Sequence, residues 1–106
     1  MPNRNKNRGD ELEREVVNLM REHGFRCERT LERGARSDGS KTWDIDLYAN
    51  GDTAMIGECK RKKSGFKFIY DSLSDNDFLV IRQDRHDRLY VLPEEIFIDL
   101  IYGKKR

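Results

Sequence analysis

The residues best suited to chemistry in this sequence are two carboxylates and a lysine, Asp46, Glu58 and Lys60. Side chains alternate along a strand, so Glu58 and Lys60, two positions apart, leave the same face of one predicted strand. Asp46 lies on the preceding predicted strand, within cross-strand reach of that pair. Carboxylates brought together repel and are usually accompanied by a cation. The spacing therefore predicts a site for a hard divalent ion such as Mg²⁺, which prefers a few carboxylate oxygens plus water.

Lys60 also begins a basic run that contains no acid and continues with Arg61, Lys62 and Lys63. Beside a metal, a lysine can orient or help deprotonate a bound water, or stabilise charge on a phosphate under attack. The neighbouring bases place positive charge where a phosphate backbone would arrive. The alternative is an ordinary cross-strand pair on the surface, since an Asp followed by Glu-x-Lys can occur by chance in so charged a chain. Asp44, one pair earlier on the face of Asp46, is interpreted as a surface acid at a strand end.

Charge is segregated along the chain, although the formal net charge is only +1. Residues 1–8, residues 60–67 and residues 104–106 contain bases without acids, so the remainder is acidic. Such segregation can attract a polyanion to one face of the molecule. Basic ends that only keep the protein in solution are the alternative.

Composition narrows the class of protein. Charged residues make up 39% of the 106 residues, and no apolar run approaches the roughly 18 residues of a membrane span, so no membrane partner is expected. We expect a basic arm over residues 1–8 and a single domain over residues 9–106. Two cysteines are too few for a secreted disulfide framework, which favours a cytoplasmic setting. The sequence has neither zinc-like Cys and His spacing nor a Walker loop, so neither structural zinc nor a nucleotide cofactor is expected.

Hydrophobic periodicity predicts the elements that position the site. A helix is expected over residues 10–23, with Asp10 as its N-cap, Glu13 as its capping-box glutamate and Gly24 after its end. Alternation predicts strands over residues 25–31, 43–48 and 53–59, and Asn50-Gly51 predicts a tight hairpin between the last two.

The second half of the sequence predicts a helix over residues 66–73, strands over residues 78–81 and 89–92, and a helix over residues 94–102. The apolar run at residues 78–81 is typical of a centrally buried strand. The last helix is apolar nearly all round, which suggests packing on a partner subunit. The element order is αβββαββα, a mixed α/β domain.

The pattern Asp46, Glu58-Cys59-Lys60 resembles the motif of the PD-(D/E)XK nuclease superfamily. That resemblance implies a restriction-endonuclease-like αβββαβ core with a mixed central sheet and a C-terminal helix. Residues of the first helix, Arg8-Gly9, Glu13-Arg14-Glu15 and His23-Gly24-Phe25, are similar to the opening of archaeal-type Holliday junction resolvases, an assignment that extends to relatives encoded by phages.

The resemblance implies roles for individual residues. Glu13, Asp46, Glu58 and Lys60 would be catalytic. Asp46, Glu58 and the backbone carbonyl of Cys59 would hold the metal, with Glu13 as a further ligand unless it is only a capping residue. The implied DNA contacts are Arg8, Arg14, Arg29, Arg36, Ser40, Arg61, Lys62 and Lys63, with Ser37 competing with Ser40 for the role of the loop serine.

The function implied is a Mg²⁺-dependent endonuclease, with Mn²⁺ as a substitute, that resolves four-way DNA junctions by paired nicks. A homodimer is expected, because a four-way junction has two-fold symmetry and an isologous dimer presents two sites. It would act in the cytoplasm of a prokaryotic or phage-infected cell. Two alternatives remain: a nuclease or nickase of the same superfamily on linear duplex DNA, and a non-catalytic DNA-binding protein.

Overall fold

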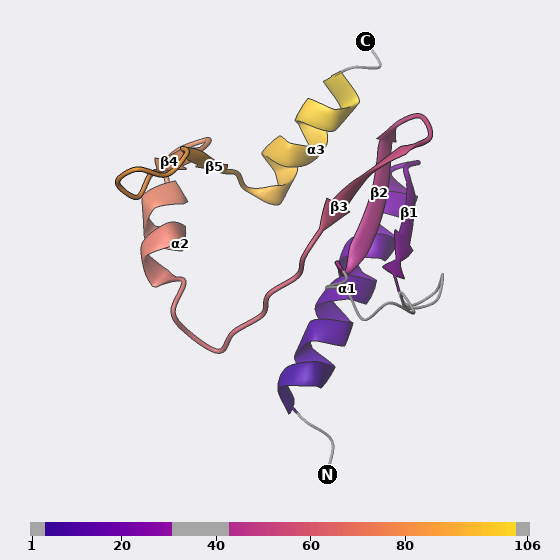
Figure 1. Cartoon of the computed structure of the whole chain (residues 1–106), viewed down its shortest axis with the longest axis horizontal. Helices are drawn as coiled ribbons and strands as arrows, with labels where there is room; N and C mark the ends of the chain where they lie inside the picture. Colours follow the sequence, from indigo (N-terminus) through magenta and orange to yellow (C-terminus); the bar gives the residue numbers. More distant parts are fainter. Residues whose placement is uncertain (1–3, 31–42, 104–106) are drawn as a thin grey trace. The chain divides into compact units, whose positions relative to one another are not determined.

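The computed structural model describes residues 4–30 and 43–103, with only the backbone described over residues 4–8. The elements follow the predicted order: α1 (Arg4–Glu22), β1 (Arg26–Arg29), β2 (Ile45–Asn50), β3 (Thr53–Gly57), α2 (Lys67–Leu73), β4 (Leu79–Ile81), β5 (Leu89–Val91) and α3 (Glu94–Gly103) (Figure 1). The chain divides into two compact units, Met1–Lys62 and Lys63–Arg106. That the two units form the single domain expected from the sequence stays a prediction.

Helix α1 is longer than its sequence pattern predicts. It begins at Arg4 rather than at Asp10, so the predicted N-cap lies inside the helix and Glu13 is not a capping-box residue. A glycine inside a helix costs only about 1 kcal/mol, and Gly9 is accommodated there. The end agrees with the prediction, because Gly24 adopts a φ of 87° and the N–H of Phe25 donates to the carbonyl of Met20 at 3.0 Å.

Strands β1, β2 and β3 form an antiparallel sheet in that order, and the Asn50-Gly51 hairpin is confirmed, with Gly51 at a φ of 73°. Cys27, Leu47 and Met55 lie opposite one another across the three strands and therefore share a face. Helix α1 packs against β1 and β2, as Figure 1 shows. The buried apolar residues of this unit are Val17, Met20, Phe25, Cys27, Ile45 and Leu47.

Strand β3 ends at Gly57, two residues earlier than predicted. Glu58 and Lys60 therefore lie beyond the strand. Strand alternation, which was expected to place their side chains on the same face, does not apply to them. The N–H of Asp44, just before β2, donates to the carbonyl of Gly57 at 3.0 Å. Within the described part of the chain, this is the last backbone hydrogen bond between the β2 and β3 segments.

The second unit contains a two-stranded antiparallel hairpin, β4–β5, between α2 and α3. Glu94 and Glu95 occupy the first turn of α3 after Pro93, as predicted. The prediction that residues 78–81 form a centrally buried strand is wrong: Phe78 is 54% exposed and Val80 is 40% exposed. A two-stranded sheet has no central strand, so one face of β4 is open to solvent.

The α/β class and the element order are thus confirmed. A mixed central sheet is not observed, since the strand pairs within the described residues are all antiparallel. Over the same residues, no helix is long and apolar enough to cross a membrane.

Candidate active site at the end of the three-stranded sheet

Glu13 is the acid that α1 directs toward the sheet. It is 9% exposed, and its Oε2 lies 3.6 Å from Nη2 of Arg29 on β1. The same Arg29 nitrogen donates to Oδ1 of Asp10 at 3.1 Å. One guanidinium therefore holds two acids that are three residues apart on one face of α1.

The environment of Glu13 favours its neutral form. Burial, the charge of Asp44 and the charge of Asp10 raise the pKa of Glu13, in that order of size, while Arg29 opposes them. Two carboxylates that interact across a half-buried space accept a proton more readily, and they also attract a divalent cation. The interaction between Glu13 and Asp44 is therefore the feature that can do chemistry.

Asp44 was interpreted from the sequence as a surface acid, and the structure gives it a more central position. It is half-buried, and its carbonyl accepts from the N–H of Thr30 at 3.0 Å. Its carboxylate Oδ2 accepts from the N–H of Cys59 at 2.7 Å. Asp44 thereby joins the start of β2 to the segment that carries Glu58. No sequence signal separated it from Asp46, because alternation places both on one face.

Asp46 lies elsewhere. It is 1% exposed, and its Oδ1 accepts from the indole N–H of Trp43 at 2.5 Å. It pairs in register with Glu28 and Ile56, whereas Arg29, which reaches α1, belongs to the alternate set. Asp46 therefore leaves the sheet on the face opposite to Glu13, and the structure does not bring these two predicted acids together.

Glu58, Cys59 and Lys60 follow the end of β3. Oε1 of Glu58 lies 3.6 Å from Nζ of Lys60, and their side chains are 44% and 70% exposed. The pKa of the Cys59 thiol is raised to about 11, by burial first and then by the charges of Asp44 and Glu13. The thiol is thus protonated at neutral pH, and the charges of both acids act on it.

The carboxylates fit a hard cation in an open site. Among the residues that the structure describes, no three His, Cys, Asp or Glu side chains lie close enough to hold a metal. Mg²⁺ does not need such a cage, because it is usually bound through one or two carboxylates and keeps several waters. Glu13 and Asp44 supply carboxylate oxygens of that kind. Glu58 immediately precedes Cys59, whose N–H donates to Asp44.

The predicted DNA contacts differ in their surroundings. Arg14, Arg61, Lys62 and Lys63 are exposed, and Nη1 of Arg61 lies 2.8 Å from Oε2 of Glu11 on α1. Arg29 is only 13% exposed at its side chain and holds Asp10 and Glu13, so a structural contact accounts for it. The Arg8 side chain, Arg36, Ser37 and Ser40 lie outside what the structure describes.

The family model of the archaeal Holliday junction resolvase (Hjc) matches residues 4–72. The chain belongs to this family. Membership implies a nuclease that resolves Holliday junctions, with branched DNA as its substrate. The matched part contains α1, the three-stranded sheet and most of α2, and therefore all of the candidate active site. Comparison with curated proteins and with solved structures gives no match.

Proposed function

We propose that this Hjc-family protein is a Mg²⁺-dependent endonuclease that resolves four-way DNA junctions by paired nicks, with Mn²⁺ as a substitute ion. The observation that carries the proposal is the placement of two acids at one end of the sheet: Glu13, which is 9% exposed beside Arg29, and Asp44, which is joined to the backbone beside Glu58 by the 2.7 Å bond to Cys59. Removing two carboxylates from water costs free energy, so their burial is not explained by solubility or surface charge alone. This pair of acids is the arrangement that a bound divalent cation would stabilise.

In this proposal Glu13 and Asp44 hold the metal, with the carbonyl of Cys59 as a further ligand, and the exposed side chain of Glu58 turns toward the ion when it binds. Asp46 is the competing candidate from the sequence. A bound divalent ion supplies Lewis acidity toward a phosphodiester and lowers the pKa of its bound water. The residues of the chain provide the rest: Arg29 orients Glu13, and the Cys59 amide orients Asp44.

Lys60 is proposed to contact the phosphate under attack. Its side chain is 70% exposed and is held by one weak ion pair at 3.6 Å, which a phosphate group can replace. Arg61 and Lys62 follow it and are exposed, so they can neutralise the neighbouring phosphates. Loss of these bases should lower affinity and flatten its salt dependence.

The experiment is cleavage of a synthetic four-way junction by the full chain in Mg²⁺. We expect Asp44→Asn and Glu58→Gln each to lose about 10²-fold or more in rate, as removal of a metal ligand does. Asp46→Asn, if it folds, should lose much less, because its carboxylate lies on the other face of the sheet. If Asp44→Asn is fully active while a folded Asp46→Asn is inactive, the metal ligand is Asp46 and not Asp44.

The same assay separates the alternative functions. A linear duplex of the same sequence, cleaved as fast as the junction, would favour a duplex nuclease or nickase. Binding without cleavage in Mg²⁺ or Mn²⁺ would favour a non-catalytic DNA-binding protein. Paired nicks require two active sites on one junction, so we also propose a homodimer, to be checked by analytical ultracentrifugation.

A further inference from the structure

The β4–β5 hairpin lies outside residues 4–72, the part matched by the family model, and carries a surface that the proposed cleavage does not use. Val80 lies opposite Tyr90, while Leu79 and Ile81 lie opposite Val91 and Leu89. Alternation therefore sets Val80 and Tyr90 on one face of the hairpin. By the same rule, Arg82 and Arg88, which follow the paired residues at the loop end, continue that face.

This face exposes aromatic surface. Tyr90 is 62% exposed and Phe78 is 54% exposed. Their ring centroids lie 6.1 Å apart with an interplanar angle of 38°. Neighbouring aromatic rings left open to water offer π surface to a planar ligand.

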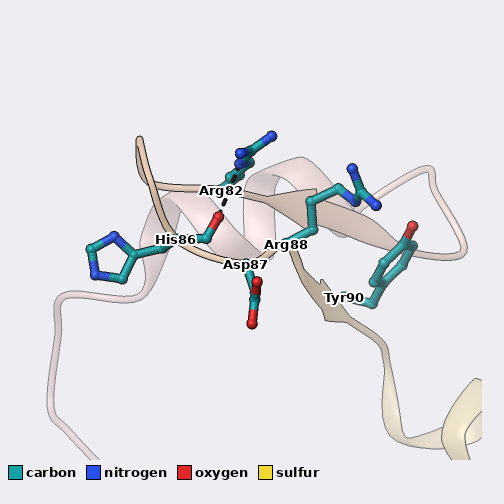
Figure 2. A pocket seen from close by; sticks show the side chains of 5 residues that line it. All are labelled: Arg82, His86, Asp87, Arg88 and Tyr90. Atoms are coloured by element: carbon teal, nitrogen blue, oxygen red, sulfur yellow. Dashed lines mark hydrogen bonds between the residues drawn. The ribbon is translucent and has the colours of Figure 1, made fainter.

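Two guanidinium groups and the ring of Tyr90 lie around an open cavity of about 320 Å³, lined by Arg82, His86, Asp87, Arg88 and Tyr90. Nε of Arg82 donates to the carbonyl of His86 at 3.0 Å, which fixes the position of this guanidinium. In Figure 2 the side chains of Arg82 and Arg88 rise on one side of the hairpin, and that of Asp87 points to the other. The cavity thus presents two positive groups and one ring to the same side.

We propose that this face binds an unpaired stretch of the DNA substrate, with Arg82 and Arg88 on phosphodiester groups and Tyr90 stacked on a base. The inference rests on the proposed function, and it names the part of the substrate that the second unit holds. An aromatic platform beside cationic groups suits single-stranded nucleic acid, because every base has a π face. Bases inside a duplex are already stacked on each other, so duplex DNA would use only the arginines.

The test is fluorescence anisotropy of the full chain with a labelled oligothymidylate of about ten nucleotides, a length within the usual site size of such platforms. No divalent metal is added, so binding is measured apart from cleavage. Loss of a stacked base weakens binding by about tenfold or more, which we expect for Tyr90→Ala, while Tyr90→Phe should stay within about twofold of wild type. Arg82→Gln and Arg88→Gln should each weaken binding several-fold and lower its salt slope by about one phosphate.

Arg85→Gln is the matched control, because it removes one charge from the same hairpin at a residue that does not line the cavity. It should bind within about twofold of wild type. Thermal melts identify any variant that does not fold. If Tyr90→Ala is one, Arg82→Gln and Arg88→Gln carry the test, and wild-type binding by both would overturn the proposal.

The proposal is overturned if Tyr90→Ala binds the oligothymidylate as tightly as wild type, or if duplex of equal length suffers the same loss. It is equally overturned if Tyr90→Ala changes the oligomeric state and leaves DNA affinity intact, because the face would then be a protein interface. Failure of the nuclease proposal is distinct from both, since it appears as absent cleavage in Mg²⁺ with oligonucleotide binding preserved.

Discussion

The two units of the chain use charge in opposite ways. At the end of the three-stranded sheet, acids are drawn into half-buried positions and held by one guanidinium and one backbone amide. On the β4–β5 hairpin, arginines and aromatic rings stand exposed. Buried charge is fixed in place at a cost in stability, which suits reaction chemistry. Exposed charge remains exchangeable, which suits binding to a polyanion.

The largest expected effect comes from Glu13→Gln. Junction cleavage in Mg²⁺ should fall by about 10²-fold or more, while oligothymidylate binding by the hairpin is unchanged. The matched control is Glu15→Gln, an exposed acid on the same helix, which should cleave at nearly the wild-type rate. Equal losses of cleavage in both variants would contradict a special role for the buried Glu13, because the exposed Glu15 would matter as much.

Although Glu13→Gln should lose cleavage activity, it should not lose thermal stability. The pKa of Glu13 is raised above its ordinary value of 4.5, so the folded chain binds this proton at higher pH than the unfolded chain does. The folded state is therefore favoured by this group as pH falls, and ionised Glu13 opposes folding near neutral pH. Glu13→Gln should melt at the same or a higher temperature at pH 7. A markedly lower melting temperature would show that the ion pair with Arg29 outweighs burial.

Arg29→Gln should lower the free energy of unfolding by about 1–3 kcal/mol, because it leaves half-buried acids without their cation. It should also raise the pKa of Glu13 further and shift the rise of cleavage to higher pH. Arg88→Gln, on the exposed hairpin, should change stability by less than about 0.5 kcal/mol. Urea denaturation of both variants compares the two regions directly, and equal effects would contradict the contrast between buried and exposed arginines.

Backbone conformation offers a second comparison of the two regions. Gly24 has a φ of 87° and Arg85 has a φ of 68°, both in the left-handed region. Gly24→Ala should destabilise the chain by about 1 kcal/mol and Arg85→Gly should stabilise it by a few tenths of a kcal/mol or more, since only glycine is relaxed in this region; urea denaturation measures both.

Gly9→Ala should stabilise the chain by about 0.5–1 kcal/mol if α1 runs through this position, as the structure has it. A destabilising Gly9→Ala would restore the later helix start.

At neutral pH the smallest effect concerns Cys59. Its pKa of about 11 lies above the ordinary 9.0, so the unfolded chain ionises first as pH rises. The contribution of this group to stability is full below pH 9.0 and is lost as pH rises toward about 11. Cys59→Ala should remove that part of the alkaline slope. At pH 8, iodoacetamide should label Cys59 slowly in the folded chain and rapidly in urea, as mass spectrometry would show.

Much of the fold follows from local pattern. Gly24 at the end of α1, the Asn50-Gly51 hairpin and the Pro93-Glu94-Glu95 start of α3 were predictable, because each depends on the conformation of a few consecutive residues. The start of α1 was not, since Asp10 has the chemistry of an N-cap and the structure uses it instead as a partner of Arg29. The buried position expected for residues 78–81 also failed, because an apolar run does not say how many strands flank it.

The candidate site was predicted in part. Glu13 and the Glu58-Cys59-Lys60 segment followed from the motif and from family resemblance, and in the structure the charge of Glu13 acts on Cys59. Asp44 was interpreted as a surface acid, because alternation cannot distinguish two acids at the boundary of a strand, and Asp46 as a metal ligand stays a prediction. Where β2 begins and β3 ends is decided by pairing between segments distant in sequence.

By itself, therefore, the sequence determined the α/β class, the order of the elements, the basic run after residue 59 and the resemblance to junction resolvases. These depend on composition, periodicity and short motifs, which are local properties of the chain. Only the tertiary structure decided that the charges of Asp44 and Glu13 interact, that Arg29 holds two acids and that the β4–β5 hairpin exposes its rings and arginines. Strand register and burial arise from contacts between distant segments, and no pattern of neighbouring residues contains that information.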